Sequence, residues 1–196
     1  MNRKVILALS VVLGLCTAAH AEGPAGMVLY FESDNEVYLL LADHQGRASK
    51  RGWGSFGGGA SKGESAAETA ARETEEETRG YFLRSDLLKT IKDQVPVVSA
   101  AGFSLYFARV AFAPVQRIAN NAIPEDAKPY AERGPYAWVP YSELERHLLS
   151  PIKRSKKHRI DERFLPEGYH SDWAWPAWLG SRRLAIESGA LPWAKK

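Results

Sequence analysis

Cysteine is almost absent from this chain of 196 residues, which contains only Cys16. A chain with one cysteine cannot form an intramolecular disulfide, so its stability has to come from a packed core. The histidines show no spacing with one another or with Cys16 that is typical of a zinc site. The sequence also lacks the Lys and Ser/Thr that follow the glycines of a P-loop, and no Ser, His and acid set stands out. These absences argue against zinc chemistry, ATPase chemistry and a nucleophilic side chain.

Long hydrophobic runs are confined to the start of the chain. A positively charged beginning is followed by an apolar run from Val5 to Cys16 and then by Ala19-His20-Ala21. This order is typical of a secretory signal peptide over residues 1–21, with cleavage before Glu22. The apolar run of about twelve residues is shorter than the roughly twenty that a membrane-spanning helix needs. We therefore expect an exported protein, in the periplasm or, as the alternative, secreted to the medium.

Two other interpretations of this segment are weaker. The apolar run could remain as an uncleaved membrane anchor, or Cys16 could carry a lipid. The bulky Leu15 directly before Cys16 does not resemble a lipoprotein signal. Removal of Arg3 and Lys4 with the signal would leave 24 Lys and Arg against 23 Asp and Glu, so net charge says little about partners. The remaining length favours one main domain, which we place at residues 22–150.

The most informative segment is an acidic helix that follows a run of glycines. Ser65 and Glu68 have the spacing of a capping box, in which a serine oxygen caps the helix and a glutamate reaches back. The following residues are reasonable to good helix formers, and Gly80 can adopt the left-handed conformation that ends a helix. The pattern predicts a helix from Ala66 to Arg79.

One face of this helix is small and the neighbouring positions are acidic. At about 100° per residue, a stripe of small residues could pack closely on a sheet; it comprises Ala66, Ala67, Ala70, Ala71, Thr74 and Thr78. Glu73, Glu76 and Glu77 flank the stripe, and Glu73 and Glu77 form a like-charge pair one turn apart. A bound cation would reverse this repulsion. Clustered carboxylate oxygens suit Mg²⁺, which is usually held together with substrate phosphates. The alternative is a solvated acidic face.

Residues around these carboxylates strengthen the metal-phosphate interpretation. Arg72 lies one turn from Glu68 and from Glu76, so a charge-assisted contact could hold Glu76 in place. Before the helix, four glycines permit tight turns and the close approach of a phosphate ligand; they are Gly57, Gly58, Gly59 and Gly63. A plain surface helix needs no such lead-in.

The spacing of these residues resembles the Nudix box. Gly58 is followed after five residues by Glu64 and, after seven more, by Arg72-Glu73-Thr74-Glu75-Glu76-Glu77. Trp53 stands eleven residues before Glu64, as in the lead-in that is common in this family. Four positions depart from the family's pattern: Phe56 replaces a proline, Ser61 an acidic residue, Thr74 an aliphatic residue and Arg79 the closing glycine.

The resemblance implies a divalent-metal-dependent hydrolysis of a diphosphate bond in a nucleoside diphosphate derivative or similar organic pyrophosphate, by water attack at phosphorus. It implies Mg²⁺, with Mn²⁺ as a substitute, bound by Glu76 and Glu77. Glu73 would be a ligand or the general base, Glu64 an accessory ligand or an orienting residue, and Arg72 a further member of the catalytic set. The glycines would contact phosphate.

The family also places the general base outside the box in some members. Three carboxylates of a Pro-containing segment are candidates for that role, and we interpret each as a solvated loop residue: Glu125, Asp126 and Glu132.

The fold that the resemblance implies is an α/β class, a Nudix-type α/β/α sandwich with a mixed sheet and a loop-helix-loop site. The sequence independently predicts strands at residues 27–32 and 36–42 around an Asp34-Asn35 turn. Residues 103–112 are aromatic and branched, which favours another strand. Residues 83–93 are ambiguous, with a short helix at Asp86 to Lys89 as one interpretation.

Tyr136-Ala137-Trp138-Val139-Pro140 resembles a second family habit, a strand ending in W-V-P before a short helix. Ser142 and Glu145 have the spacing of another capping box.

The tail at residues 151–196 is basic and rich in tryptophan, and we expect it to pack on the domain. Lys153 to Arg159 contains five Lys/Arg and a histidine. The favoured interpretation is a solvated loop balanced by Asp161 and Glu162; the alternative is contact with an anionic substrate, lipid headgroup or nucleic acid. Four tryptophans lie here, namely Trp173, Trp175, Trp178 and Trp193. They would anchor the tail, or else stack on a ligand or meet a membrane interface.

Two functional classes follow. The first is an exported Nudix pyrophosphohydrolase with a small-molecule diphosphate substrate, for which no nucleic-acid partner is expected. The second is a catalytically weak Nudix-fold binding module for a phosphorylated ligand or protein. The intact Glu73, Glu76 and Glu77 favour the enzyme. A displacement of the metals by an ångström would impair catalysis more than binding.

Overall fold

The computed structural model describes residues 22–45, 52–123, 127–149 and 158–195. The expected signal peptide, Glu125, Asp126 and the lysines from Lys153 to Lys157 lie outside these ranges. Within them, no helix has both the length and the apolar character needed to cross a membrane.

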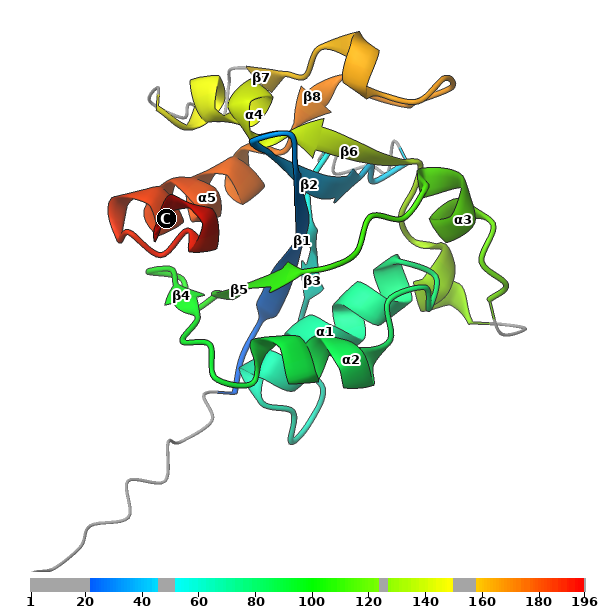
Figure 1. Cartoon of the computed structure of the whole chain (residues 1–196). Helices are drawn as coiled ribbons and strands as arrows, with labels where there is room; N and C mark the ends of the chain where they lie inside the picture. Colours follow the sequence, from blue (N-terminus) through cyan, green and yellow to red (C-terminus); the bar gives the residue numbers. More distant parts are fainter. Residues whose placement is uncertain (1–21, 46–51, 124–126, 150–157, 196) are drawn as a thin grey trace, which may run out of the picture.

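A mixed six-stranded sheet forms the centre of the molecule (Figure 1). Its main path is β4-β5-β1-β2-β6, and β3 also pairs with β1. The strands are β1 (Ala25–Ser33), β2 (Glu36–Ala42), β3 (Phe56–Gly58), β4 (Val97–Val98), β5 (Ser104–Arg109) and β6 (Tyr136–Pro140). β1 runs parallel to β5 and antiparallel to β2 and β3. Both expected early strands and their turn are confirmed, with Asp34 and Asn35 at φ values of 51° and 62°.

Alternation along the strands sends side chains into two separate cores, because successive residues of a strand point to opposite faces. In β1, Met27 and Leu29 enter the core on one face, whereas Val28 and Tyr30 enter the core on the other. Helices cover both faces, so the expected α/β/α sandwich is confirmed.

The first face is covered by α1 (Ala66–Glu77), α2 (Arg84–Ile91) and α3 (Val115–Ala119). Ser65 caps α1 and makes the expected capping box with Glu68. Ala70 and Ala71 are fully buried on the small stripe of α1, which packs on β1 and β3. The short side chains allow this helix to lie close to the sheet.

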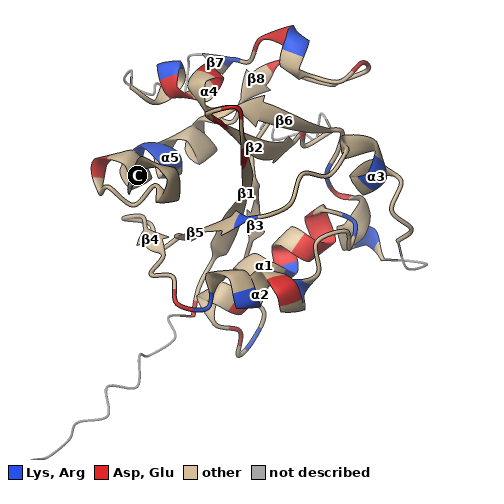
Figure 2. Ribbon diagram, in the orientation of Figure 1, with Lys and Arg blue, Asp and Glu red and all other residues tan. Residues whose placement is uncertain are grey.

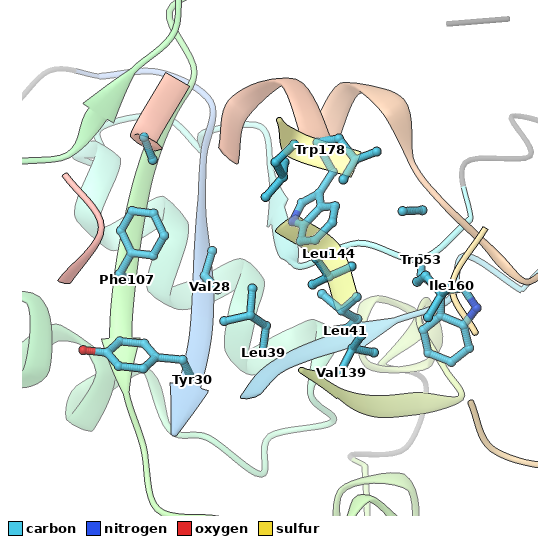
Figure 3. Packing of buried hydrophobic residues seen from close by; sticks show 14 of the residues in the cluster. Val28, Tyr30, Leu39, Leu41, Trp53, Phe107, Val139, Leu144, Ile160 and Trp178 are labelled. Atoms are coloured by element: carbon cyan, nitrogen blue, oxygen red, sulfur yellow. The ribbon is translucent and has the colours of Figure 1, made fainter. Parts of the chain in front are cut away.

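The opposite face is covered by α4 (Tyr141–Leu148) and α5 (Pro176–Glu187). Figure 3 shows Leu144 of α4 and Trp178 of α5 beside Leu39, Leu41 and Val139 of the sheet. Leu144 is fully buried and Trp178 is 4% exposed. Large side chains therefore fill the space on this face.

A second, two-stranded sheet belongs to the tail. It consists of β7 (His158–Arg159) and β8 (Trp173–Ala174). Trp53 exchanges backbone hydrogen bonds with this region, donating to Trp173 O at 2.9 Å and accepting from Trp175 N at 2.8 Å. The tail thus holds the segment that leads into β3. Short helices complete the described chain: η1 (Lys128–Ala131), η2 (Glu162–Phe164) and η3 (Pro192–Lys195).

Two expectations about helix bounds need correction. The acidic helix ends at Glu77 rather than Arg79, because Arg79 and Gly80 both adopt positive φ, 57° and 71°. The ambiguous segment forms α2 over Arg84–Ile91, longer than the expected short helix.

The expected capping box at Ser142 is wrong. α4 begins at Tyr141, so Ser142 lies inside the first turn and its hydroxyl pairs with the Glu36 carboxylate of β2.

The basic cluster of the tail is described only at His158 and Arg159. His158 is buried, whereas Arg159 pairs with Asp172 instead of with the expected Asp161 or Glu162. The four tail tryptophans are buried or half-buried.

Candidate functional site

Strand β3 brings the glycines against β1 and α1. Gly57 has a φ of 148°, and a Cβ atom there would come within 2.6 Å of both Ala25 O and Gly26 Cα. A Cβ atom on Gly58 would lie 2.5 Å from the Glu73 carboxylate. Only glycine fits at Gly57, because side chains avoid both its φ value and the contact with backbone atoms, whereas a side chain at Gly58 would displace the Glu73 carboxylate. The glycines therefore let the carboxylates of α1 approach the backbone of β3.

Arg72 gathers three of the expected site residues. Its Nε lies 2.9 Å from Glu64 Oε1, and its Nη1 lies 2.9 Å from Glu73 Oε1 and 2.9 Å from Glu76 Oε2. Its Nη2 donates to Gly59 O at 2.8 Å. The planar guanidinium suits such multiple contacts better than an ammonium group would. The expected contact with Glu76 is present, whereas Glu68 instead pairs with Ser65.

The surrounding charges fix the protonation of this cluster. Hydrogen bonding by Arg72 lowers the pKa of Glu64. Burial alone would lower the pKa of Arg72, but its contacts with Glu64, Glu73 and Glu76 outweigh burial and raise it. Figure 2 shows acidic residues along α1. Arg72 is the one basic residue of this helix and remains a cation, which offsets part of the negative charge.

Glu77 lies deeper, between β3 and the buried Arg133. Its Oε2 accepts from Gly57 N at 2.9 Å, and its Oε1 lies 3.2 Å from Arg133 Nη1. Glu77 is 7% exposed and Arg133 3%. Burial raises the pKa of Glu77, while the Arg133 charge and the Gly57 amide act in the opposite direction. This carboxylate ties the end of α1 to the glycine strand.

Glu73 is the partly buried carboxylate opposite Gly58. Burial raises its pKa, the Arg72 charge lowers it, and the nearby Glu77 and Glu76 carboxylates raise it further. A carboxylate whose pKa is raised is a reasonable acceptor for a proton from water. The geometry keeps both roles open for Glu73, ligand and general base.

The donor set fits a hard divalent cation. Four carboxylates, namely Glu64, Glu73, Glu76 and Glu77, approach one end of β3, and all their ligand atoms are oxygen, which Mg²⁺ and Mn²⁺ prefer. In the described part of the chain, no three acidic, histidine or cysteine side chains are grouped to hold one ion. Their oxygens are instead directed to Arg72, Arg133 and Gly57. Arg72 and Arg133 thus form ion pairs with the carboxylates in this arrangement.

Sequence reasoning missed Arg133, although it considered the adjacent Glu132. Arg133 Nη2 donates to Ala42 O at 2.8 Å and to Gly54 O at 2.9 Å, besides the contact with Glu77. Arg133 lies in a loop with no periodic pattern, so no sequence signal indicates that it is buried. It joins the end of β2 to the segment before β3.

Tyr136 and Asp43 were also missed. The Tyr136 hydroxyl donates to Glu77 O at 2.8 Å and so holds the last turn of α1. Asp43 is 1% exposed, and among the described residues its carboxylate oxygens find no hydrogen bond of ordinary geometry, although the His44 and His170 amides lie near enough to affect its charge. Burial raises the pKa of Asp43, while the amides of His44 and His170 and the Arg133 charge lower it. In the sequence, an aspartate directly after a strand is typical of a turn, so nothing there indicates that Asp43 is buried.

Comparison with known families decides the identity of the fold. A model of the NUDIX domain matches residues 22–164. The chain belongs to the NUDIX domain family. The resemblance to the Nudix family is confirmed. The match continues past residue 150, where we expected the domain to end.

Several solved structures are similar to this chain at low identity. A MutT/nudix family protein from Enterococcus faecalis is 16% identical, with 61% of this chain and 44% of that chain covered and a TM-score of 0.40. The C. elegans Ap4A hydrolase binary complex is 20% identical, with 62% and 80% covered and a TM-score of 0.39. The NUDIX domain of Shewanella oneidensis NrtR complexed with ADP ribose is 18% identical, with 63% and 75% covered and a TM-score of 0.38. No curated protein matches the sequence. The chain thus spans less than half the length of the Enterococcus protein.

Proposed function

We propose that this Nudix protein hydrolyses a diphosphate bond in a nucleoside diphosphate derivative or similar organic pyrophosphate, by water attack at phosphorus. The observation that carries the proposal is that Arg72 pairs with Glu64, Glu73 and Glu76, while Glu73 and Glu77 lie against the glycine strand. The chemistry needs positioning and neutralisation of phosphate charge, and these residues surround a place where both can occur.

Each residue has a distinct part in this proposal. Glu76, Glu77 and Glu73 would hold Mg²⁺ or Mn²⁺, with Glu64 as an accessory ligand. Bound metal would neutralise the phosphate oxygens and lower the pKa of a bound water. Glu73, whose carboxyl pKa burial raises, could instead accept the proton of the attacking water.

Arg72 and the glycines would prepare the site for phosphate. Arg72 orients Glu64, Glu73 and Glu76 at once. The backbone of Gly57 to Gly59 and Gly63 has little steric bulk and would allow a phosphate to approach. When metal enters, the carboxylates would exchange part of their contact with Arg72 for contact with the cation.

The test is turnover by the full chain with a panel of nucleotide sugars, ADP-ribose and dinucleoside polyphosphates, with Mg²⁺ or Mn²⁺. We expect release of nucleoside monophosphate, reduced by at least about 100-fold in Glu76→Gln and Glu77→Gln, because a metal ligand is lost. Glu75→Gln is the matched control, since Glu75 lies on the same helix outside the expected ligand set. Equal activity in all three variants would overturn the assignment of ligands.

The second candidate, a binding module, draws on one observation. The four carboxylates are occupied by Arg72, Arg133 and Gly57, and no three described acidic side chains are grouped around one point. If this arrangement persisted with metal present, phosphate binding would survive and turnover would be weak. Calorimetric titration with Mg²⁺, followed by the turnover panel, separates the two candidates: metal binding without turnover would favour the module.

We also propose that the protein is exported, on the strength of the N-terminal sequence pattern. Expression of the full chain in a Gram-negative host, followed by fractionation and N-terminal sequencing, tests this. Periplasmic protein beginning at Glu22 is the expected result. Full-length protein in the cytosol would contradict it.

A further inference from the structure

A cavity of about 660 Å³ lies between the glycine strand and the tail. Gly57 and Gly58 of β3 form one side, Phe103 stands before β5, and α5 supplies Trp175, Trp178 and Arg182 at the other side. This volume is in the range of pockets that hold small organic ligands. α5 lies beyond the residues that the NUDIX domain model matches. The tail of this chain therefore contributes one wall of a cavity that shares Gly57 and Gly58 with the expected phosphate site.

Small residues make up most of the cavity lining, and four aromatic side chains stand among them, namely Phe56, Phe103, Trp175 and Trp178. A Cβ atom built on Gly54 would lie 3.4 Å from Trp178 Cγ and 3.7 Å from Trp175 Cε3, so both indoles pack against this glycine. Phe103 lies on the other side, where its Cζ would be 3.2 Å from a Cβ atom on Gly57. Flat aromatic surfaces favour a planar ligand that can stack.

Arg182 is a buried cation in this wall. It is 3% exposed and has no ion pair with any residue in the described ranges. Its Nη2 donates to Ser55 Oγ, which also accepts from Trp178 Nε1 at 2.8 Å. Its guanidinium lies over the Trp178 ring, 5.1 Å from the ring centroid, and within the described ranges its Nε and Nη1 have no hydrogen-bond partner. Buried donors without a hydrogen bond are costly, so a ligand that offers acceptors would stabilise them.

The chemistry of Arg182 restricts what could satisfy it. A guanidinium has only donors, so its partner must present acceptors. A carbonyl oxygen on the edge of a planar heterocycle meets both this requirement and that of the aromatic walls. Adenine presents an amino donor at the corresponding position, whereas guanine, hypoxanthine and uracil present a carbonyl oxygen.

We propose that this cavity holds the base of a nucleotide substrate and that Arg182 selects bases with a carbonyl oxygen over adenine. The inference rests on the proposed function for the attached diphosphate. Gly57 contacts Glu77 and Gly58 lies against Glu73, and both glycines line the cavity. A base between the tryptophans therefore directs its phosphates past the glycines to the carboxylates of α1.

The test measures binding without catalysis, so that it does not depend on metal or turnover. Inosine and purine riboside differ by the 6-carbonyl oxygen, and adenosine carries the amino group instead. Calorimetric titration of the metal-free full chain should show inosine binding at least about tenfold more tightly than either of the other nucleosides, because one good base-edge contact supplies such discrimination. In Arg182→Met this preference should disappear, while stacking retains weak binding of all three.

A second pair of variants tests the location of the ligand. Gly180 lines the cavity, and a Cβ atom there would meet no other atom within 4 Å. Gly180→Leu should project into the cavity and weaken inosine binding by at least about tenfold. Gly180→Ala, the matched control, should retain the wild-type affinity. Circular dichroism and thermal unfolding of each variant identify any that fail to fold.

The results separate this inference from the proposed function. Selective nucleoside binding without diphosphate hydrolysis would support the base site and contradict the enzyme. Hydrolysis with nucleoside binding that is unchanged in both Arg182→Met and Gly180→Leu would overturn the base site and leave the enzyme standing. Absence of nucleoside binding at millimolar concentration, or tighter binding of adenosine than of inosine, would overturn the inference.

Discussion

The two helical layers are built in opposite ways. α1 packs on the sheet through alanine and threonine; Arg72 pairs with Glu73 and Glu76 along the helix, and Glu77 is buried at its end. α4 and α5 pack through leucine and tryptophan and bury Arg182. The first layer allows backbone and charge to approach closely, whereas α5 of the second layer lines a cavity. In the two proposals above, charge chemistry and base selection lie on opposite faces of the sheet that meet at β3.

The largest effect should come from breaking the buried link at the end of α1. In Arg133→Met, Glu77 loses its ionic partner while it remains buried, and we expect a loss of about 3–5 kcal/mol in the free energy of unfolding. Urea denaturation measures this value. The double variant with Glu77→Gln should recover much of the loss, because the unpaired charge is removed. Arg163→Met is the control: Arg163 is 70% exposed in its pair with Asp161, so a loss above about 1 kcal/mol there is not expected.

The leucine-and-tryptophan layer should be sensitive to the removal of volume. Leu144→Ala should cost about 2–5 kcal/mol in the free energy of unfolding, because Leu144 is fully buried and its loss leaves a cavity. Leu149→Ala, five residues along the chain and 67% exposed, should be nearly neutral in the same urea experiment. A neutral Leu144→Ala would show that the layer relaxes around the missing side chain.

The alanine layer should be sensitive to the addition of volume. Ala70→Leu forces a larger side chain between α1 and the sheet and should cost about 1–3 kcal/mol. It should also reduce kcat/KM in the diphosphate assay, because α1 would move away from the glycine strand. Ala67→Leu on the same helix is the control, since Ala67 is only half-buried. Equal stability of the two variants would contradict the close packing described for Ala70.

Asp43, which follows β2, makes the stability of the fold depend on pH. Burial raises its pKa above the value of 3.8 that an aspartate ordinarily has, so the ionised form destabilises the fold as pH rises beyond that value. Asp43→Asn removes this charge. Relative to the wild type, the variant should gain stability as the pH rises above the ordinary aspartate value, until Asp43 is fully ionised in the folded protein. Thermal unfolding across this pH range checks the sign; a relative stability that falls with pH would contradict the prediction.

The smallest effect concerns the end of α1. Arg79 has a φ of 57°, a conformation that costs a residue with a Cβ atom about 1–2 kcal/mol. Arg79→Gly would relieve this cost but lose the hydrogen bond from Arg79 Nε to Asn121 O at 3.2 Å. We expect a net gain of about 0.5 kcal/mol by urea denaturation. Arg79→Ala loses the same hydrogen bond and keeps the strain, so it should be less stable than Arg79→Gly.

Sequence prediction succeeded where the signal is local. The Ser65–Glu68 capping box and the strand at residues 36–42 agree with the structure because each depends on neighbouring residues. The failures have a physical pattern. The predicted capping box at Ser142 failed because the Ser142 hydroxyl donates instead to the carboxylate of Glu36, which is distant in sequence. The helix end was misplaced because Asn121 stabilises the unusual Arg79 backbone by accepting from Arg79 Nε through its carbonyl and donating from Nδ2 to Arg79 O.

By itself, the sequence determined the family and the candidate carboxylates, because the spacing that identifies them lies within one short segment of the chain. Only the tertiary structure decided which partners those carboxylates have. Glu77 meets Arg133, which lies fifty-six residues further along the chain. It also decided that Arg182 and Ser55 share one cavity wall, since long-range packing and not local periodicity brings them together. Short-range spacing fixes which groups are available, and the packing of distant segments fixes what each group contacts.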